Sequence, residues 1–234
     1  MQTQQRNFLV IGIIVAMAAV AAVIVIIISS NNTSGSSFDY SSIHTERLAD
    51  GGFILGDPNA PITIVEFADF LCPHCQEYEP TIERLIQTFV SVGQARLEYR
   101  TFPVIDATLS PYVAGLAECS DDQRQGAFWS ARDTLFAYAS AGRVYNDTSN
   151  LTRNFANDMG LDYGGLLQCL SSANQAAVDQ ELGRGLGVSG TPAVMVRYGN
   201  SAPTWITYNG QTYNRGGVAF DVIAAVIIEA QVAQ

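Results

Sequence analysis

The longest hydrophobic segment of the chain runs from Phe8 to Ile28 without a charge or a proline. About 20 such residues span a bilayer as a helix, whereas the apolar core of a signal peptide has roughly 7–15 residues. Cleavage inside "AAVAAV" would leave "IVIII" exposed on the mature protein. The pattern therefore predicts a short tail over residues 1–7 and an uncleaved transmembrane anchor over residues 8–28.

The flanks of this segment predict its orientation. Arg6 precedes it, and the next positive charge after it is Arg47. Because basic residues favour the cytoplasmic side of a membrane, we expect residues 1–7 in the cytoplasm and the remainder of the chain outside it. Residues 29–46 are rich in Ser, Asn and Gly and show no apolar periodicity, which is typical of a flexible linker.

Beyond the linker, the pattern changes from strand to helix and back. "PITIVEF", from Pro61 to Phe67, is apolar on both faces and predicts a central strand. A helix is predicted next, ending at Gly93, because its apolar residues Tyr78, Ile82, Leu85, Ile86 and Phe89 follow helical spacing. "ARLEYRTFPV" then alternates like a second strand. A strand–helix–strand unit of this kind implies a parallel pair.

The rest of the chain is mostly helical. Helical patterns separated by Gly, Asn and Asp run from Ser110 to about Leu186, and strand patterns return in "PAVMVRYG" and "TWITYNGQTY", where Asn209-Gly210 predicts a tight turn. The last segment, "VAFDVIAAVIIEAQVA", predicts a helix packed on the sheet. We therefore expect an α/β domain in two parts, residues 47–106 and 187–234, with an all-helical insertion over residues 107–186.

Composition narrows the possible partners. The chain has a net charge of -10, and all twelve of its basic residues are arginines. This charge argues against nucleic acid as a partner and against docking on anionic lipid.

Cys72 and Cys75 form a C-x-x-C motif at the start of the first predicted helix. Such a pair can bind a metal, form a structural disulfide or carry electrons. Zinc needs four ligands, and only His44 in the linker and His74 inside the motif could supplement the four cysteines of the chain, so we expect no metal site.

Two motifs together resemble a known family. "ITIVEFADFLCPHC", followed by Pro80, and the later "GVSGTPAVMV" resemble the thioredoxin superfamily, and within it the DsbA-like thiol–disulfide oxidoreductases. The resemblance extends from Gly52 to the C-terminus and implies a thioredoxin-like fold with a helical insertion. It also implies a nucleophilic Cys72, a resolving Cys75 and a cis-proline at Pro192.

The resemblance assigns roles to further residues. Pro73 and His74 would set the redox properties of the pair, Thr191 would offer its backbone to an extended peptide, and Glu66 and Glu79 would assist proton transfer. For Glu66 a second interpretation stays open, because a carboxylate at the end of an apolar strand can also reach solvent. No lysine is available to act beside these carboxylates.

The chemistry of the motif agrees with these roles. A thiolate attacks a disulfide, and the N-terminus of a helix favours negative charge on Cys72. Pro73 at the first helical position gives up no useful hydrogen bond, and a protonated His74 would add a positive charge beside the sulfur. Stabilising the thiolate stabilises the reduced pair, so the motif predicts an oxidant.

Cys119 and Cys169 lie in two separate predicted helices. We expect a structural disulfide between them, with two free thiols or a second redox pair as alternatives.

The function predicted from the sequence is that of an anchored, extracytoplasmic enzyme that introduces disulfide bonds into exported proteins. It would need no cofactor besides the Cys72–Cys75 disulfide, and the resemblance implies reoxidation by a membrane partner of the DsbB or vitamin-K-epoxide-reductase-like type. The alternatives are a reductase or isomerase of the same fold, and a tethered peptide-binding protein whose cysteines are structural.

Overall fold

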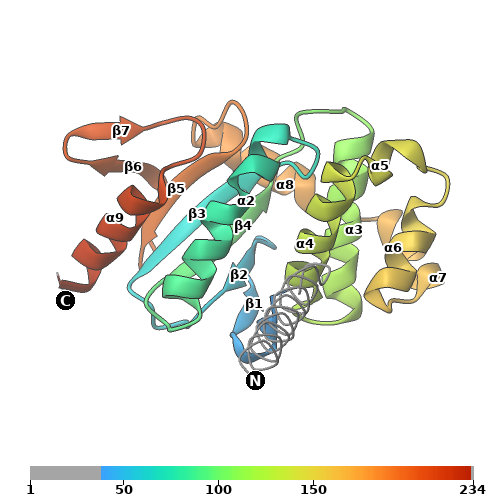
Figure 1. Cartoon of the computed structure of the whole chain (residues 1–234), viewed down its shortest axis with the longest axis horizontal. Coiled ribbons are helices and arrows are strands. Elements are labelled where there is room, and N and C mark those ends of the chain that lie inside the picture. The colour runs from blue at the N-terminus through green and yellow to red at the C-terminus, as the bar shows by residue number, and fades with distance from the viewer. Residues whose placement is uncertain (1–37, 233–234) are drawn as a thin grey trace, which may run out of the picture. The chain divides into compact units, whose positions relative to one another are not determined.

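A seven-stranded mixed sheet organises residues 38–232, the part of the chain that this computed structural model describes. The strands lie in the order β1-β2-β4-β3-β5-β6-β7 (Figure 1). Their bounds are Thr45–Arg47 (β1), Phe53–Leu55 (β2), Ile62–Ala68 (β3), Arg96–Thr101 (β4), Ala193–Tyr198 (β5), Thr204–Tyr208 (β6) and Gln211–Tyr213 (β7).

Strand β3 occupies the centre of the sheet, as its apolar sequence predicted. All seven of its residues are buried. It pairs in parallel with β4, where Glu66 lies opposite Tyr99, and antiparallel with β5, where Glu66 lies opposite Val194. The predicted parallel pair is therefore confirmed, and the segment with the C-x-x-C motif follows directly from this buried strand.

Helices α2 (Pro73–Leu85) and α9 (Phe220–Val232) pack beside each other on one face of the sheet (Figure 1). Helix α2 continues through Pro80 and passes into a π-helical turn, η2 (Ile86–Val90), closed by a bond from Ser91 N to Ile86 O at 2.9 Å. The last helix thus packs on the domain as its sequence predicted, with Ile223, Val226 and Ile227 buried.

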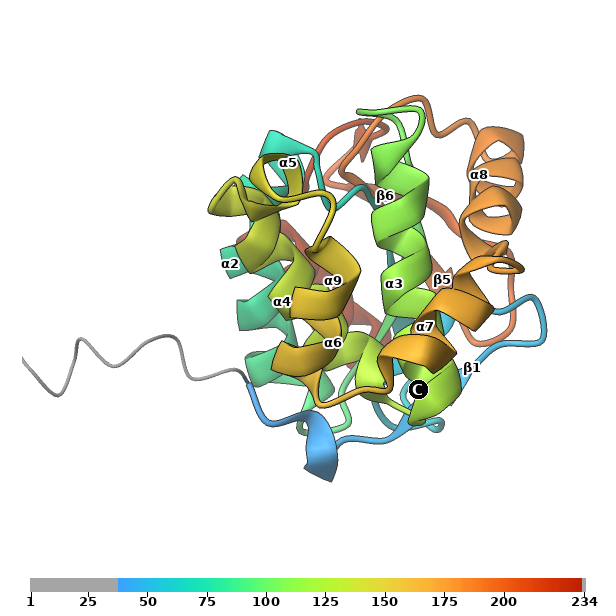
Figure 2. The ribbon, with the colours of Figure 1, turned by 90° about the vertical axis from the view of Figure 1, so that its right-hand side faces the viewer.

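The segment between β4 and β5 folds into helices, also as predicted. Their bounds are Leu109–Gln123 (α3), Ala127–Ser140 (α4), Arg143–Asn146 (α5), Leu151–Met159 (α6), Tyr163–Leu170 (α7) and Gln175–Gly185 (α8). Figure 2 shows α3, α4, α6 and α7 gathered into one block, with α8 to one side. The aromatic side chains of α4 join this block to the sheet, because the rings of Phe128 and Phe53 stack with their centroids 3.7 Å apart.

The folded unit begins earlier than the sequence predicted. A 3-10 helix, η1 (Tyr40–Ser42), and strand β1 lie within or across the end of the segment assigned to a linker over residues 29–46. Strand β2, which pairs antiparallel with β1 and β4, was not predicted either. Each of these elements has three residues, too few for a periodic pattern, and depends on pairing with distant parts of the chain.

Two further expectations concern the turn between β6 and β7 and the N-terminal segment. The tight turn at Asn209-Gly210 is confirmed, since both residues have positive φ angles, 49° and 77°, between β6 and β7. The predicted anchor over residues 8–28 lies outside the described residues. Within residues 38–232, none of the helices combines the length and apolar character that a bilayer crossing requires.

Candidate active site

The two cysteines of the motif meet at the N-terminus of α2. Cys72 is the N-cap residue, Pro73 is the first helical residue, and both thiols are free and buried, with 3% and 0% exposure for Cys72 and Cys75. The Cys72 thiol donates to the carbonyl oxygen of Thr191, with 3.4 Å between Sγ and O. The peptide bond between Thr191 and Pro192 is cis, as predicted.

The surroundings shift the pKa values of the two thiols in opposite directions. A hydrogen bond from the Cys75 thiol lowers the pKa of Cys72 to about 5, with help from the backbone N–H groups of Cys75 and His74 and against the effect of burial. The same hydrogen bond, together with burial, raises the pKa of Cys75. Cys72 is therefore suited to be the thiolate of the pair and Cys75 to stay protonated.

His74 places its backbone N–H beside Cys72 and its ring beside Glu77. Its side chain is 79% exposed, and its Nδ1 lies 3.3 Å from Glu77 Oε2, one turn further along α2. The group of His74 that lowers the pKa of Cys72 is its backbone N–H, and stabilisation of the thiolate by the imidazole stays a prediction. The helix terminus supplies this donor whatever the side chain at this position.

Glu66 lies buried in β3 and does not reach solvent. Its side chain is 0% exposed, and neither carboxylate oxygen has a hydrogen-bond partner among the described residues. Burial raises the pKa of Glu66 to about 7, although Arg132 opposes the shift from 3.9 Å away. Charge on Glu66 in turn raises the pKa of Cys75. This carboxyl group is placed to exchange a proton near neutral pH.

Glu79 belongs to the same buried cluster through an arginine that the sequence analysis missed. Arg132 of α4 is fully buried and lies 2.7 Å from Glu79 and 3.0 Å from Asp133. Burial raises the pKa of Glu79 to about 8, with Arg132 again opposing. No lysine acts beside these carboxylates, and the helical insertion instead supplies an arginine. An arginine within the apolar helix "GAFWSARDTLFAYA" was the available signal.

Asp69 holds the turn that leads into the motif. Its Oδ1 accepts from Leu71 N at 2.9 Å, and its Oδ2 accepts from Val104 N at 2.8 Å and Ile105 N at 2.9 Å. Its carboxylate thus joins this turn to the segment after β4. One buried carboxylate therefore fixes the backbone just before Cys72.

A groove of about 490 Å³ opens beside the cysteines. Three parts of the chain line it: one side of α2, the cis-proline turn, and the segment between β7 and α9. The lining residues are His74, Glu77, Tyr78, Thr81, Thr191, Pro192, Gly216, Gly217, Val218 and Ala219. The two residues predicted to bind substrate, Thr191 and Pro192, thus lie between the groove and Cys72.

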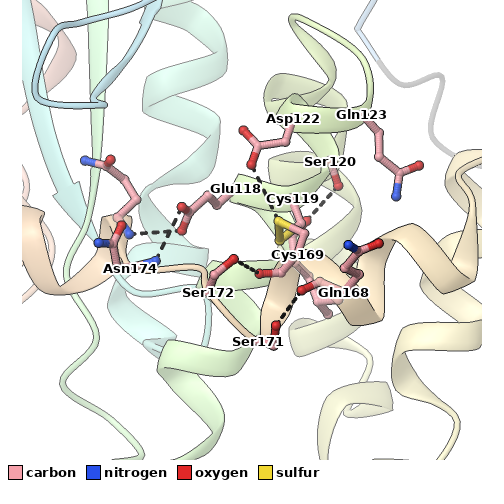
Figure 3. The surroundings of a disulfide bond; sticks show 12 residues. Glu118, Cys119, Ser120, Asp122, Gln123, Gln168, Cys169, Ser171, Ser172 and Asn174 are labelled. Atoms are coloured by element: carbon pink, nitrogen blue, oxygen red, sulfur yellow. Dashed lines mark hydrogen bonds between the residues drawn. A yellow bond between two sulfur atoms is a disulfide. The ribbon is translucent and has the colours of Figure 1, made fainter.

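The second pair of cysteines forms the predicted disulfide. Cys119 in α3 and Cys169 in α7 are bonded, with their Cα atoms 5.7 Å apart (Figure 3). Glu118, the neighbour of Cys119, accepts from the backbone of Gln175 at 3.0 Å, so the start of α8 is tied to the same place. This bond stays within the helical insertion. No group of three or more metal-binding side chains occurs in residues 38–232.

Comparison with known proteins assigns this sequence to a family. The family model described as Thioredoxin matches residues 49–202. The Na(+)/H(+) antiporter NhaA 3 of Salinispora tropica is 33% identical over 151 residues, which cover 63% of this chain and 22% of the antiporter. The probable disulfide bond formation protein D of Bacillus anthracis is 34% identical over 83 residues, covering 35% of this chain and 38% of that protein. The chain thus spans well under half the length of these curated relatives.

Solved structures share the fold at lower sequence identity. The crystal structure of α-DsbA1 from Wolbachia pipientis superposes with a TM-score of 0.65 at 20% identity, covering 80% of this chain and 96% of that one. Oxidised BdbD from Bacillus subtilis gives a TM-score of 0.57 at 20% identity, covering 76% and 91%. At this identity the similarity establishes the thioredoxin-like fold with its helical block.

Proposed function

Because the chain belongs to the thioredoxin family, we propose that it is a thiol–disulfide oxidoreductase that introduces disulfide bonds into exported proteins through Cys72 and Cys75. The observation that carries this proposal is the difference between the two thiols. The pKa of Cys72 is lowered to about 5 while the pKa of Cys75 is raised, within a pair only three residues apart. A structural disulfide needs no such difference, whereas a reversible one depends on it.

The reaction begins with the pair oxidised. A substrate thiolate attacks Cys72 Sγ, the bond between Cys72 and Cys75 breaks, and Cys75 leaves with the electron pair and takes up a proton. A second substrate thiolate then attacks the substrate sulfur of the mixed disulfide and releases Cys72 as a thiolate. The substrate loses two electrons to form its disulfide, and the Cys72–Cys75 pair gains them.

Glu66 is the group that we assign to the proton of Cys75. It is buried, its charge acts on the Cys75 thiol, and its pKa of about 7 allows it both to give and to accept a proton near neutrality. Arg132 and Glu79 support this role by setting the charge around Glu66. Proton transfer by a positioned carboxyl is a common catalytic device when its pKa lies near the working pH.

The cis-proline turn and the groove next to it suit an extended polypeptide. The Thr191 carbonyl contacts the Cys72 sulfur, so a substrate cysteine joined to Cys72 must lie against this turn. Backbone groups at such a turn can pair with an extended chain in the manner of an added strand.

The location and the redox partner complete the proposal. We place the enzyme on the outer side of the membrane, held by the anchor predicted over residues 8–28. Each turnover leaves the pair reduced, so a membrane reoxidase of the DsbB or vitamin-K-epoxide-reductase-like type is the proposed partner.

Oxidation of a dithiol peptide tests the function directly. The full-length oxidised protein, purified in detergent, is mixed with a peptide containing two cysteines, and disulfide formation is followed by mass spectrometry. We expect stoichiometric oxidation by the unaltered protein and none by Cys72→Ser. Alkylation of the reduced protein should show Cys72 titrating near pH 5. A thiol that titrates near 9, or a protein that reduces insulin faster than it oxidises the peptide, would contradict the proposal.

A further inference from the structure

The segment Gly216–Ala219 forms the outer wall of the groove, and the side chain of Tyr78 bonds this wall to the catalytic helix. Tyr78 lies in α2, on the same helix as the active-site cysteines. Its hydroxyl donates to Val218 O at 2.7 Å and accepts from Val218 N at 3.1 Å, so it satisfies both backbone groups of one residue. Val218 belongs to the segment between β7 and α9, far from α2 in sequence.

The backbone of this segment lies directly on the tyrosine ring. A Cβ atom on Gly217 would come within 2.5 Å of Tyr78 Cδ2, closer than real contacts allow. Gly216 has a φ angle of 72°, which favours glycine, and pairs with Ala193, the residue after the cis-proline. The two glycines therefore let the segment pass between the ring of Tyr78 and the start of β5.

The two ends of the wall have partners of their own. Gly216 is bridged to Ala193, and at the other end Ala219 O accepts from Val222 N at 3.0 Å and Ile223 N at 3.2 Å in α9. Between these ends, the buried Val218 has both of its backbone groups bonded to the Tyr78 hydroxyl. Figure 1 shows α2 and α9 side by side on the same face of the sheet, which is where the segment enters α9. The Tyr78 hydroxyl therefore bonds the middle of the wall to α2.

We propose that Tyr78 is a positioning residue that fixes the groove wall at Gly216–Ala219 and so determines the affinity for extended polypeptide substrates, without acting on the cysteines. The inference rests on the proposed function for the identity of the occupant. A substrate cysteine that reaches Cys72 brings its neighbouring residues between His74 and Pro192, both of which line the groove. A small dithiol has no such neighbours and does not need the wall.

Substitution of Tyr78 by phenylalanine separates these two kinds of substrate. Tyr78→Phe keeps the ring against Gly217 but leaves the backbone N–H and carbonyl of Val218 without their partner. We expect the KM for a dithiol peptide to rise about three- to tenfold, the range that corresponds to loss of one or two hydrogen bonds. The maximal rate, the pH profile of Cys72 alkylation and the rate with dithiothreitol should stay unchanged.

Tyr112→Phe is the matched control. The Tyr112 hydroxyl also forms a hydrogen bond, to Thr152, but it does so inside the helical block. This variant loses one tyrosine hydroxyl contact away from the groove, so its KM should equal that of the unaltered protein. An increase of the same size in both variants would overturn the proposal, as would equal slowing of the peptide and of dithiothreitol by Tyr78→Phe.

A binding measurement keeps this test independent of the proposed function. The probe is the same peptide with serine in place of both cysteines and a fluorescent label, titrated with full-length protein and followed by anisotropy. A weaker affinity for Tyr78→Phe than for Tyr112→Phe supports the groove even if the unaltered protein exchanges no thiols, a result that would reject only the oxidoreductase. Equal affinities of the two variants would overturn the role of Tyr78.

Discussion

At the scale of single residues, the chemistry of this protein depends on a difference in proton affinity between two neighbouring sulfurs. The pKa of Cys72 lies below its ordinary value, so its thiolate stabilises the folded reduced protein at neutral pH, and this contribution is lost as the pH falls through about 5. The oxidised protein has no thiolate at Cys72 and therefore lacks this stabilising contribution. Under the proposed function, this favours the reduced state at neutrality and the transfer of the disulfide to a substrate.

Glu66→Gln tests the proton donor through two independent measurements. Burial raises the pKa of Glu66 from an ordinary 4.5 to about 7, so its contribution to folding is fully present below about 4.5 and is lost as the pH rises through about 7. Glutamine does not ionise. The free energy of unfolding of this variant, measured with urea at pH 5 and pH 8, should therefore fall less between these pH values than that of the unaltered protein. Its rate of peptide oxidation should be lower by about tenfold or more.

Glu181→Gln, at an exposed position of α8, is the control for this substitution and should match the unaltered protein in both measurements. If Glu66→Gln oxidises the peptide at the normal rate, Glu66 does not supply the proton. If its pH dependence of stability is also normal, the carboxyl group is not held in the buried, neutral form described above.

The sequence predicted the reactive residues better than their supporting residues. Cys72, Cys75 and Pro192 belong to short motifs that can be read locally. Arg132 could not be assigned, because its importance arises only when α4 packs against α2 and brings the guanidinium between two carboxylates. The motif also could not specify the rotamer of His74, whose ring lies toward Glu77.

At the scale of helices and strands, long periodic patterns were predictable and short paired ones were not. Strand β3, helix α2 and the β6–β7 turn follow from apolar spacing and from Asn209-Gly210. Strands β1 and β2 have three residues each, with β1 paired to β2 and β2 paired to β4, so no local signal marks them. The predicted linker extends too far toward Arg47 because its sequence is mostly polar. Tyr40, which is buried beside Trp129 of α4, does not stand out in such a stretch.

The disulfide between α3 and α7 acts at this scale, and its removal should affect stability alone. Cys119 and Cys169 are 50 residues apart, and a crosslink of this length stabilises the folded state by about 4 kcal/mol in the chain-entropy model. We expect the double variant Cys119→Ala/Cys169→Ala to lose up to that amount of unfolding free energy in urea, while its rate of peptide oxidation at 20 °C stays normal. Unchanged stability with impaired oxidation would instead indicate a second redox pair.

At the scale of the whole molecule, the sequence separated the sheet into two parts and placed a helical block between them, which the structure bears out. The sequence could not predict which residues of each part meet at the candidate site. The helical insertion contributes Arg132 to the buried cluster beside Cys75, and the last connection of the chain contributes the groove wall. The active site is thus assembled from the first strand–helix unit, the insertion and the C-terminal segment, and only the first of these carries the cysteine motif.

The overall charge leads to a prediction about substrate choice. With a net charge of -10 and an exposed Glu77 beside the groove, the protein should attract basic polypeptides and repel acidic ones. Raising the ionic strength from about 0.01 M to about 0.15 M shortens the Debye length from about 30 Å to about 8 Å and should weaken this attraction. For an arginine-rich dithiol peptide, we expect kcat/KM to fall at least about threefold over this range, whereas an aspartate-rich peptide of the same length should be oxidised faster. Stopped-flow measurements on both peptides check this, with dithiothreitol as the uncharged reference. Salt dependence of the same sign for both peptides would show that the protein's charge does not guide its substrates to Cys72.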